Sequence, residues 1–285
     1  MKNRMSRVKF QAGKRRKLRL KKKVAVFLFL FFFLLLGYSS IKIYNWYSDN
    51  NKVNDVSKSL KKVRTKKNKD NENTSYVNYG DDQDSDYFKY IKYSLLEVDF
   101  NDLIKKNKDT VGWVSVKGTN INYPVVQTTD NDYYLSHAYD KSNNKAGWVF
   151  MDYRNNAKNM DQNTVIYAHS RFNGTMFGSL KKLLTSSWYK NKDNYVIWFS
   201  TPYENTLWQV FSVYTIPKES YYITTRFDDD DSYTTFLKTI KGRSMEEFSG
   251  NVSNRDKILT LSTCKDNFGN RVVMHAKLIK VEKRG

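Results

Sequence analysis

The hydrophobic pattern of this chain changes character along its length. Residues 24–41 form a predominantly apolar stretch without a charged side chain. Residues 42–80 then carry few apolar positions in any period, and from residue 111 onward apolar and polar residues alternate. Because successive side chains of a strand point to opposite faces, this alternation predicts a folded part that is mostly β.

Eight alternating segments are predicted to be strands. They are residues 111–117, 121–127, 147–153, 163–169, 195–200, 207–216, 257–264 and 271–282. Phe88, Ile91, Leu95 and Leu96 follow helical spacing instead, and two further helices are predicted at residues 99–106 and 176–190. Many short strands with few helices predict a mostly antiparallel barrel with helical additions.

A long insertion, residues 217–254, separates the sixth predicted strand from the seventh. Four consecutive aspartates at residues 228–231 precede Tyr233, Phe236 and Ile240, which follow helical spacing. Carboxylates are favoured at the start of a helix by the positive end of its dipole. We therefore expect these aspartates to begin a helix, and we predict neither a metal site nor a cofactor.

The apolar stretch follows a strongly basic N-terminus. The first 23 residues hold twelve Lys or Arg and no acidic residue. Eighteen helical residues rise about 27 Å, close to the thickness of a bilayer's hydrocarbon core, and a basic flank favours the cytoplasmic side. A cleaved signal peptide is the alternative, but nothing after Gly37 resembles an Ala-x-Ala cleavage site.

These patterns predict four parts. They are a cytoplasmic basic tail at residues 1–23, a transmembrane signal-anchor helix at 24–41, a flexible extracellular stalk at 42–85 and a folded extracellular domain at 86–285. The expected location is therefore the cell membrane, with a single pass. Of the net charge of +20, little belongs to the folded part, because residues 81–285 hold 28 basic and 25 acidic residues. A nucleic-acid binder would carry a basic surface on its folded domain, so nucleic acid is not an expected partner.

Cys264 is the only cysteine and ends the seventh predicted strand. A catalytic thiolate is one interpretation and a small buried side chain is the other. A cysteine nucleophile needs a partner for proton transfer. His169 ends the fourth predicted strand as Cys264 ends its own, His275 lies inside the last strand, and His137 lies in a polar segment. The pattern favours His169 and leaves His275 as a competitor.

Two neighbours of Cys264 are candidates for supporting roles. Alternation places Ser262 on the strand face that carries Cys264. Arg271 opens the next predicted strand, after a predicted hairpin loop at residues 265–270. A guanidinium there can donate two parallel hydrogen bonds to an oxygen that gains charge. On pattern alone, a polar filler and a surface arginine remain the alternatives.

Several motifs occur in a fixed order. Thr-Leu-Ser-Thr-Cys stands at residues 260–264, and Arg-Val-Val stands at residues 271–273. Together they closely resemble the active-site signature of sortases, the membrane-anchored cysteine transpeptidases of Gram-positive bacteria. The segments that resemble class B sortases in particular are residues 119–127, 130–135, 150–155, 167–169 and 174–177.

The resemblance covers about residues 86–282 and implies an eight-stranded sortase-type β-barrel with N-terminal helices and a helical insertion before the cysteine strand. It implies that Cys264 attacks the threonine carbonyl of a C-terminal sorting signal and forms a thioester. His169 would transfer protons, and Arg271 would stabilise the oxyanion. The acyl group would pass to an amine of a cell wall precursor or of another surface protein. Substrate-binding roles are implied for Asn131, Leu135, Tyr167, Tyr222, Ile223 and Ser262.

Two other functions remain open at this point. One is a different exported cysteine peptidase or acyltransferase that acts on wall peptides. The other is a non-catalytic surface barrel that binds a wall component or a host ligand.

Overall fold

The computed structural model describes residues 21–61, 65–79, 85–263 and 269–284, and the chain forms two compact units, Met1–Tyr47 and Ser48–Gly285. The described part of the first unit belongs to helix α1 (Lys22–Lys61). An 18-residue window of this helix has a mean hydropathy of 2.5, and none of that window is buried. By length and composition, α1 can therefore cross a membrane, as the apolar stretch predicts.

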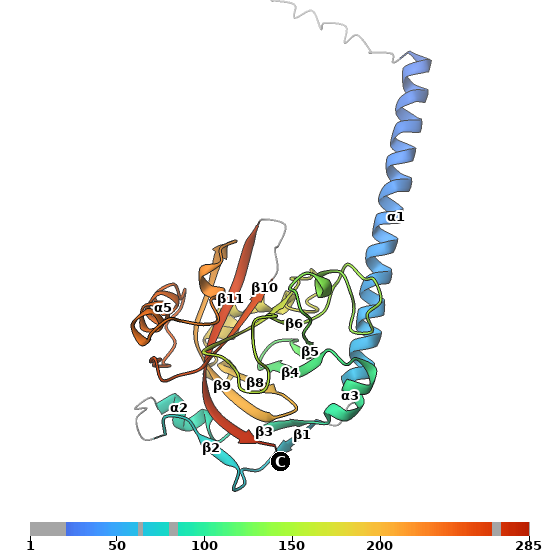
Figure 1. Ribbon diagram of the computed structural model, residues 1–285. Coiled ribbons are helices and arrows are strands. Elements are labelled where there is room, and N and C mark those ends of the chain that lie inside the picture. Colours follow the sequence, from blue (N-terminus) through green and yellow to red (C-terminus); the bar gives the residue numbers. More distant parts are fainter. Residues whose placement is uncertain (1–20, 62–64, 80–84, 264–268, 285) are drawn as a thin grey trace, which may run out of the picture. The chain divides into compact units, whose positions relative to one another are not determined.

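The second unit is built on a closed barrel of eight strands (Figure 1). The order around the barrel is β10-β7-β6-β5-β4-β8-β9-β11, and the pairing of β11 with β10 closes it. The strands are β4 (Thr110–Val116), β5 (Asn122–Val126), β6 (Phe150–Met151), β7 (Asn163–Ala168), β8 (Val196–Ser200), β9 (Glu204–Pro217), β10 (Ile258–Thr263) and β11 (Asn270–Lys283). Among these described strands, only β5–β6 and β7–β10 are parallel pairs. The predicted barrel is confirmed.

A chain with one cysteine can form no internal disulfide. The barrel is therefore stabilised mainly by the burial of apolar side chains. The core contains the fully buried rings of Trp113, Trp148 and Trp208. A separate apolar cluster joins the barrel to the insertion through β9, β10, β11 and helix α5 (Asp230–Gly242).

Helix α5 starts as the aspartate run predicts. The side chain of Asp229 accepts the backbone N–H of Ser232 at 2.7 Å, and the two residues form a capping box. Tyr233, Phe236 and Ile240 are buried on the inner face of the helix. The aspartates thus lie where the helix dipole favours negative charge. The insertion also contains the short 3-10 helix η4 (Tyr221–Ile223).

Three predicted elements differ from the structure. Leu95 and Leu96 belong to strand β3 (Leu95–Val98) and not to helix α2 (Ser85–Tyr90), because β3 pairs with the distant β1 (Thr65–Asn68). The predicted strand at 147–153 contributes only the two residues of β6.

The third difference is the predicted helix at residues 176–190. It is divided into a 3-10 helix, η2 (Gly178–Leu184), and the short α4 (Ser186–Tyr189), because Thr185 between them is extended. The predicted helix at residues 99–106 is confirmed as α3 (Phe100–Lys106), which Asp99 caps. The remaining short helices are η1 (Tyr133–Leu135) and η3 (Lys192–Asn194).

The segment expected to be a stalk carries more structure than its polar composition indicates. Val53 and Leu60, near the end of α1, are each 1% exposed and belong to the core of the second unit. Strand β2 (Thr74–Tyr76) pairs with β11, and the buried Lys280 of β11 forms an ion pair with Asp70. The compact unit therefore begins at Ser48 in the structure, whereas the composition places the start of the domain at residue 86.

Candidate active site

The parallel pair β7–β10 brings two strand ends to the same rim of the barrel. Its last paired residues are Ala168 and Thr263. His169 follows Ala168 directly, as Cys264 follows Thr263 in the sequence. Cys264 itself lies outside the described residues. The register agrees with the sequence prediction that His169 and Cys264 follow neighbouring strand ends.

The hydrogen bond of His169 defines which ring nitrogen carries the proton. Its Nε2 lies 2.7 Å from the carbonyl oxygen of Leu135, which can only accept, so Nε2 is the protonated nitrogen. Within the described part of the chain, Nδ1 has no hydrogen-bond partner. Burial lowers the pKa of the imidazole below its usual 6.5, although the Leu135 bond opposes this shift. The neutral ring therefore presents an available lone pair at Nδ1.

Gly147 supports the imidazole from one side. Its φ is +63°, a conformation that glycine adopts at little cost. A Cβ at this position would lie 2.9 Å from Cδ2 of His169 and 2.6 Å from the carbonyl oxygen of Tyr134. The absence of a side chain at residue 147 thus allows His169 to occupy its place. No pattern in the sequence distinguishes this glycine from the others.

Arg271 lies at the same rim on the other side of β10. It is the second residue of β11, which pairs antiparallel with β10 through Ser262 and Val273. Its Nη1 donates to the carbonyl oxygen of Thr263 at 3.0 Å. The guanidinium is therefore fixed beside the residue that directly precedes Cys264. The predicted hairpin loop at 265–270 lies mostly outside the described residues.

A pocket of about 510 Å³ opens at this rim. Six of its lining residues were implied by the resemblance: Asn131, Leu135, Tyr167, Tyr222, Ile223 and Arg271. They come from the loop around η1, from β7, from η4 of the insertion and from the start of β11. Ser262 is fully buried behind this wall, where its hydroxyl lies 3.0 Å from the hydroxyl of Tyr222. Ser262 thus supports Tyr222 and does not line the pocket.

His275 occupies a different environment from His169. It is completely buried in β11, and its Nδ1 and Nε2 lie 2.8 Å from the hydroxyls of Thr260 and Tyr214 respectively. Burial lowers its pKa to about 3. Both ring nitrogens are occupied by core residues, so His275 is not suited to proton transfer with a substrate.

The ring of His137 is held by contacts with Tyr133. Its ring stacks on Tyr133 with centroids 4.0 Å apart, and its Nδ1 lies 2.8 Å from the carbonyl oxygen of Tyr133. Of the three histidines, only His169 combines a position at the end of β7 with a ring nitrogen that no described residue occupies.

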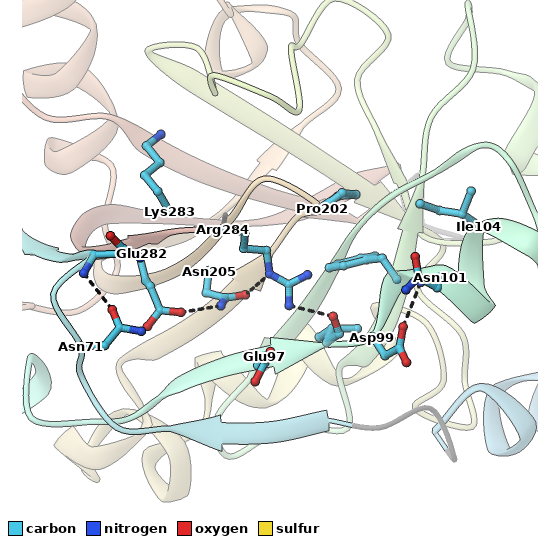
Figure 2. A pocket seen from close by; sticks show the side chains of 13 residues that line it. Asn71, Glu97, Asp99, Asn101, Ile104, Pro202, Asn205, Glu282, Lys283 and Arg284 are labelled. Atoms are coloured by element: carbon cyan, nitrogen blue, oxygen red, sulfur yellow. Dashed lines mark hydrogen bonds between the residues drawn. The ribbon is translucent and has the colours of Figure 1, made fainter.

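A larger, more polar pocket of about 730 Å³ lies elsewhere (Figure 2). Lys283 at the end of β11 lines it, whereas Arg271 is at the beginning of this 14-residue strand. Figure 2 shows Arg284 bonded to Asn205, and Nη2 of Arg284 also donates to the carbonyl oxygen of Val98 at 2.8 Å. These polar groups tie β3 to the barrel, and no residue predicted for the active site lines this pocket.

Comparisons with known proteins agree with the geometry. The sortase domain model matches residues 114–279. The chain is 40% identical over 185 residues to sortase B of Staphylococcus aureus, a match that covers 64% of this chain and 75% of that protein.

Solved structures give the same result. The structure of sortase B from B. anthracis in complex with AAEK1 has a TM-score of 0.67 and 33% identity, covering 84% of this chain and 100% of that chain. A sortase B complexed with triglycine has a TM-score of 0.60 and 39% identity, covering 64% and 85% respectively. This chain therefore belongs to the sortase family and is a cysteine transpeptidase of class B.

Proposed function

We propose that this transpeptidase cleaves a sorting signal near the C-terminus of an exported protein, after a threonine, and joins the protein to an amine. Sγ of Cys264 attacks the threonine carbonyl carbon, the peptide C–N bond breaks, and a thioester forms. An amine then attacks the thioester and releases Cys264. The observation that supports this proposal is the pairing of Ala168 with Thr263, the residues that directly precede His169 and Cys264 in the sequence.

The neutral imidazole of His169 supports its role as the proton carrier. Nδ1 can accept the thiol proton as Sγ attacks, and the imidazolium can then donate this proton to the departing amine. In the second half of the reaction, Nδ1 accepts a proton from the attacking amine. Because burial lowers the pKa of His169, its imidazolium is a stronger acid than an exposed one and donates readily.

The position of Arg271 supports a role in charge stabilisation. A guanidinium offers five N–H donors, and the bond from Nη1 to the Thr263 carbonyl uses one of them. The others can donate to the carbonyl oxygen of the signal as it gains negative charge in the tetrahedral intermediate. The main chain of the signal would lie in the pocket lined by Leu135, Tyr167 and Ile223.

The partners and the location follow from the same proposal. The chain would be anchored by residues 24–41, with its N-terminus in the cytoplasm and its catalytic unit outside the cell, because its first 23 residues are strongly basic. The acceptor would be a peptide amine of a cell wall precursor or of another surface protein. The sortase B structure complexed with triglycine supports a peptide amine as the acceptor.

Intact-protein mass spectrometry tests the proposal. The full chain, in detergent micelles, is mixed with a panel of threonine-containing signal peptides, with and without triglycine. We expect a mass increase equal to the fragment that ends in threonine, absent in Cys264→Ala and removed by triglycine. A folded protein whose thiol reacts with iodoacetamide, but which forms no adduct with any peptide, would contradict the proposal.

A further inference from the structure

A buried carboxylate lies beneath the walls of the pocket. Asp152, directly after β6, has no exposed surface. Its two oxygens accept from Nε and Nη2 of Arg154 at 2.8 and 2.7 Å, from the hydroxyl of Tyr167 at 2.8 Å and from Nδ2 of Asn131 at 3.1 Å. Such a charge is costly to bury without partners, and this one is surrounded by donors. Burial would raise the pKa of the carboxyl, but the bonds from Arg154 and Tyr167 hold it below the usual 3.8.

The partners of this carboxylate belong to separate walls of the pocket. Asn131 lies in the loop before η1, and Tyr167 lies in β7. The third wall is reached through Arg154, whose Nη2 also donates to the carbonyl oxygen of Ile223 in η4 at 2.9 Å. Asn131, Tyr167 and Ile223 all line the pocket. Two side chains therefore connect the η1 loop, the barrel wall and the insertion.

We infer that Asp152 and Arg154 are positioning residues that fix the three walls of the signal groove at one separation and so determine how tightly the signal binds. This inference rests on the proposed function, because it takes the pocket to be the signal groove. Neither residue is required to contact the signal. Arg154 holds the insertion, and Asp152 holds Arg154 together with the other two walls.

The same bonds determine which groups the groove presents. Tyr167 lines the pocket, and its hydroxyl already donates its proton to Asp152, so this proton is not available to a bound signal. Both polar groups of the Asn131 side chain are also bonded, because its Nδ2 donates to Asp152 and its Oδ1 accepts the backbone N–H of Tyr153 at 3.0 Å. Specificity at these two positions would thus arise from shape more than from direct hydrogen bonds to the signal.

Arg154 is the residue to change, because removing the buried Asp152 carboxylate endangers folding. Arg154 makes three side-chain bonds in two directions, and the single ammonium of a lysine cannot reproduce this planar fork. We expect Arg154→Gln and, to a lesser degree, Arg154→Lys to raise KM for the signal peptide about tenfold, the effect of one charge-assisted hydrogen bond. The kcat and the rate of Cys264 alkylation should stay within about twofold, because the reacting groups keep their places.

Arg226→Gln is the matched control. Arg226 is an exposed arginine of the same insertion, and its only ion pair among the described residues is with Asp161 at a distance of 4.0 Å. The KM of the Arg226→Gln variant for the signal peptide should equal that of the wild type. Hydrogen exchange provides a second readout: residues 217–227 should exchange faster in Arg154→Gln than in the wild type or in Arg226→Gln, whereas α5 should be unchanged.

The outcomes are distinguishable. Failure of the wild type to form a thioester with any signal peptide would overturn the proposed function and this inference together. A wild type that forms the thioester, with unchanged KM and unchanged exchange of residues 217–227 in Arg154→Gln, would overturn the inference alone. A loss of thermal stability without a change in KM, or a loss confined to kcat, would also overturn it.

Discussion

Two histidines flank the strand that leads to Cys264, and their surroundings differ completely. β10 lies between β7 and β11, so His169 follows the strand on one side and His275 lies within the strand on the other. His275 pairs with Thr260 in the middle of β10, whereas Ala168, the residue before His169, pairs with the last residue of that strand. Thr263 lies three residues beyond Thr260 and His169 follows Ala168, so four register positions separate the buried His275 from His169 at the strand end.

The hydrogen bonds of His275 are fully determined. Asn163 donates from Nδ2 to the carbonyl oxygens of Tyr222 and Thr224, so its Oδ1 accepts the hydroxyl proton of Thr260 at 2.6 Å. Nδ1 of His275 must then donate to Thr260, and Nε2 accepts from Tyr214. The neutral imidazole is one link in a buried network, and both of its ring nitrogens have hydrogen-bond partners.

His169 has the opposite arrangement, because one backbone carbonyl fixes its Nε2, and no described residue bonds its Nδ1. A reactive histidine therefore needs one nitrogen for orientation and another for proton transfer. In this barrel, the strand end provides that combination and the strand interior does not.

Removing each ring is the strongest test of this contrast. We expect His169→Ala to reduce kcat/KM by about 10³-fold or more, within the range for a general acid–base residue, without loss of thermal stability. His275→Ala should retain turnover but destabilise the fold by roughly 2–4 kcal/mol, because it leaves a cavity and a buried Tyr214 hydroxyl without its acceptor. Peptide turnover and thermal unfolding of both variants would check this. An active His169→Ala with an inactive but folded His275→Ala would reverse the assignment.

Arg271→Lys tests the other side of the rim. An ammonium cannot bond the Thr263 carbonyl and an oxyanion with the geometry of a guanidinium, so kcat/KM should fall by about 100-fold. The melting temperature should change little. Arg226→Lys on the exposed insertion serves as a control for the change of cation. Equal turnover of Arg271→Lys and the wild type would remove Arg271 from the mechanism.

Gly147→Ala moves His169 without removing it. The new Cβ would press on Cδ2 of His169 and on the carbonyl oxygen of Tyr134, and the φ of +63° would be strained. We expect kcat to fall roughly 10- to 100-fold, because small displacements of a catalytic group have effects of this size. Gly242→Ala is the control, since an added Cβ there meets no atom within 4 Å. Steady-state kinetics in which both variants matched the wild type would contradict the supporting role of Gly147.

The pH dependence of stability tests whether His275 is buried in its neutral form. The pKa of His275 is about 3 in the folded protein and near 6.5 when exposed, so the unfolded chain binds one more proton between these values. The contribution of neutral His275 to the free energy of unfolding is fully present above pH 6.5. It is lost as the pH falls toward 3, at about 1.4 kcal/mol per pH unit. Urea unfolding at pH 7, 6 and 5 should show a shallower dependence in His275→Gln. Identical slopes would show that His275 is not buried in its neutral form.

The sequence predicts the barrel because its strands are locally encoded. Alternation identifies β7, β10 and β11 to within about two residues, and their chain order and motifs resemble those of class B sortases. Local spacing fails at Leu95 and Leu96, because only pairing with the distant β1 makes that segment a strand. It also fails in residues 48–61, where a polar composition hides the few apolar side chains that enter the core.

The same division applies to the site. The positions of two strand ends favour His169 as a candidate, whereas the candidate role of Arg271 follows from the resemblance to class B sortases. The pattern favours His169 and leaves His275 as a competitor, because the sequence does not show that Thr260 and Tyr214 occupy both nitrogens of the buried His275 ring. The contacts of the Asp152 carboxylate also cannot be predicted from the pattern, since an acid after an apolar strand does not indicate that three remote segments converge on it. Its position in the Phe-Met-Asp-Tyr-Arg-Asn segment, residues 150–155, was the only available signal.

The rate of acyl-enzyme formation tests the contrast between the two histidines most directly. The full chain and its His169→Ala and His275→Gln variants are mixed with the same signal peptide, and the mass of the intact protein is followed over a single turnover. We predict that the wild type and His275→Gln acquire the threonine-terminated fragment at similar rates, whereas His169→Ala does not acquire it on that timescale. Acylation of His169→Ala at the wild-type rate would contradict the assignment of His169 as the proton-transfer partner of Cys264.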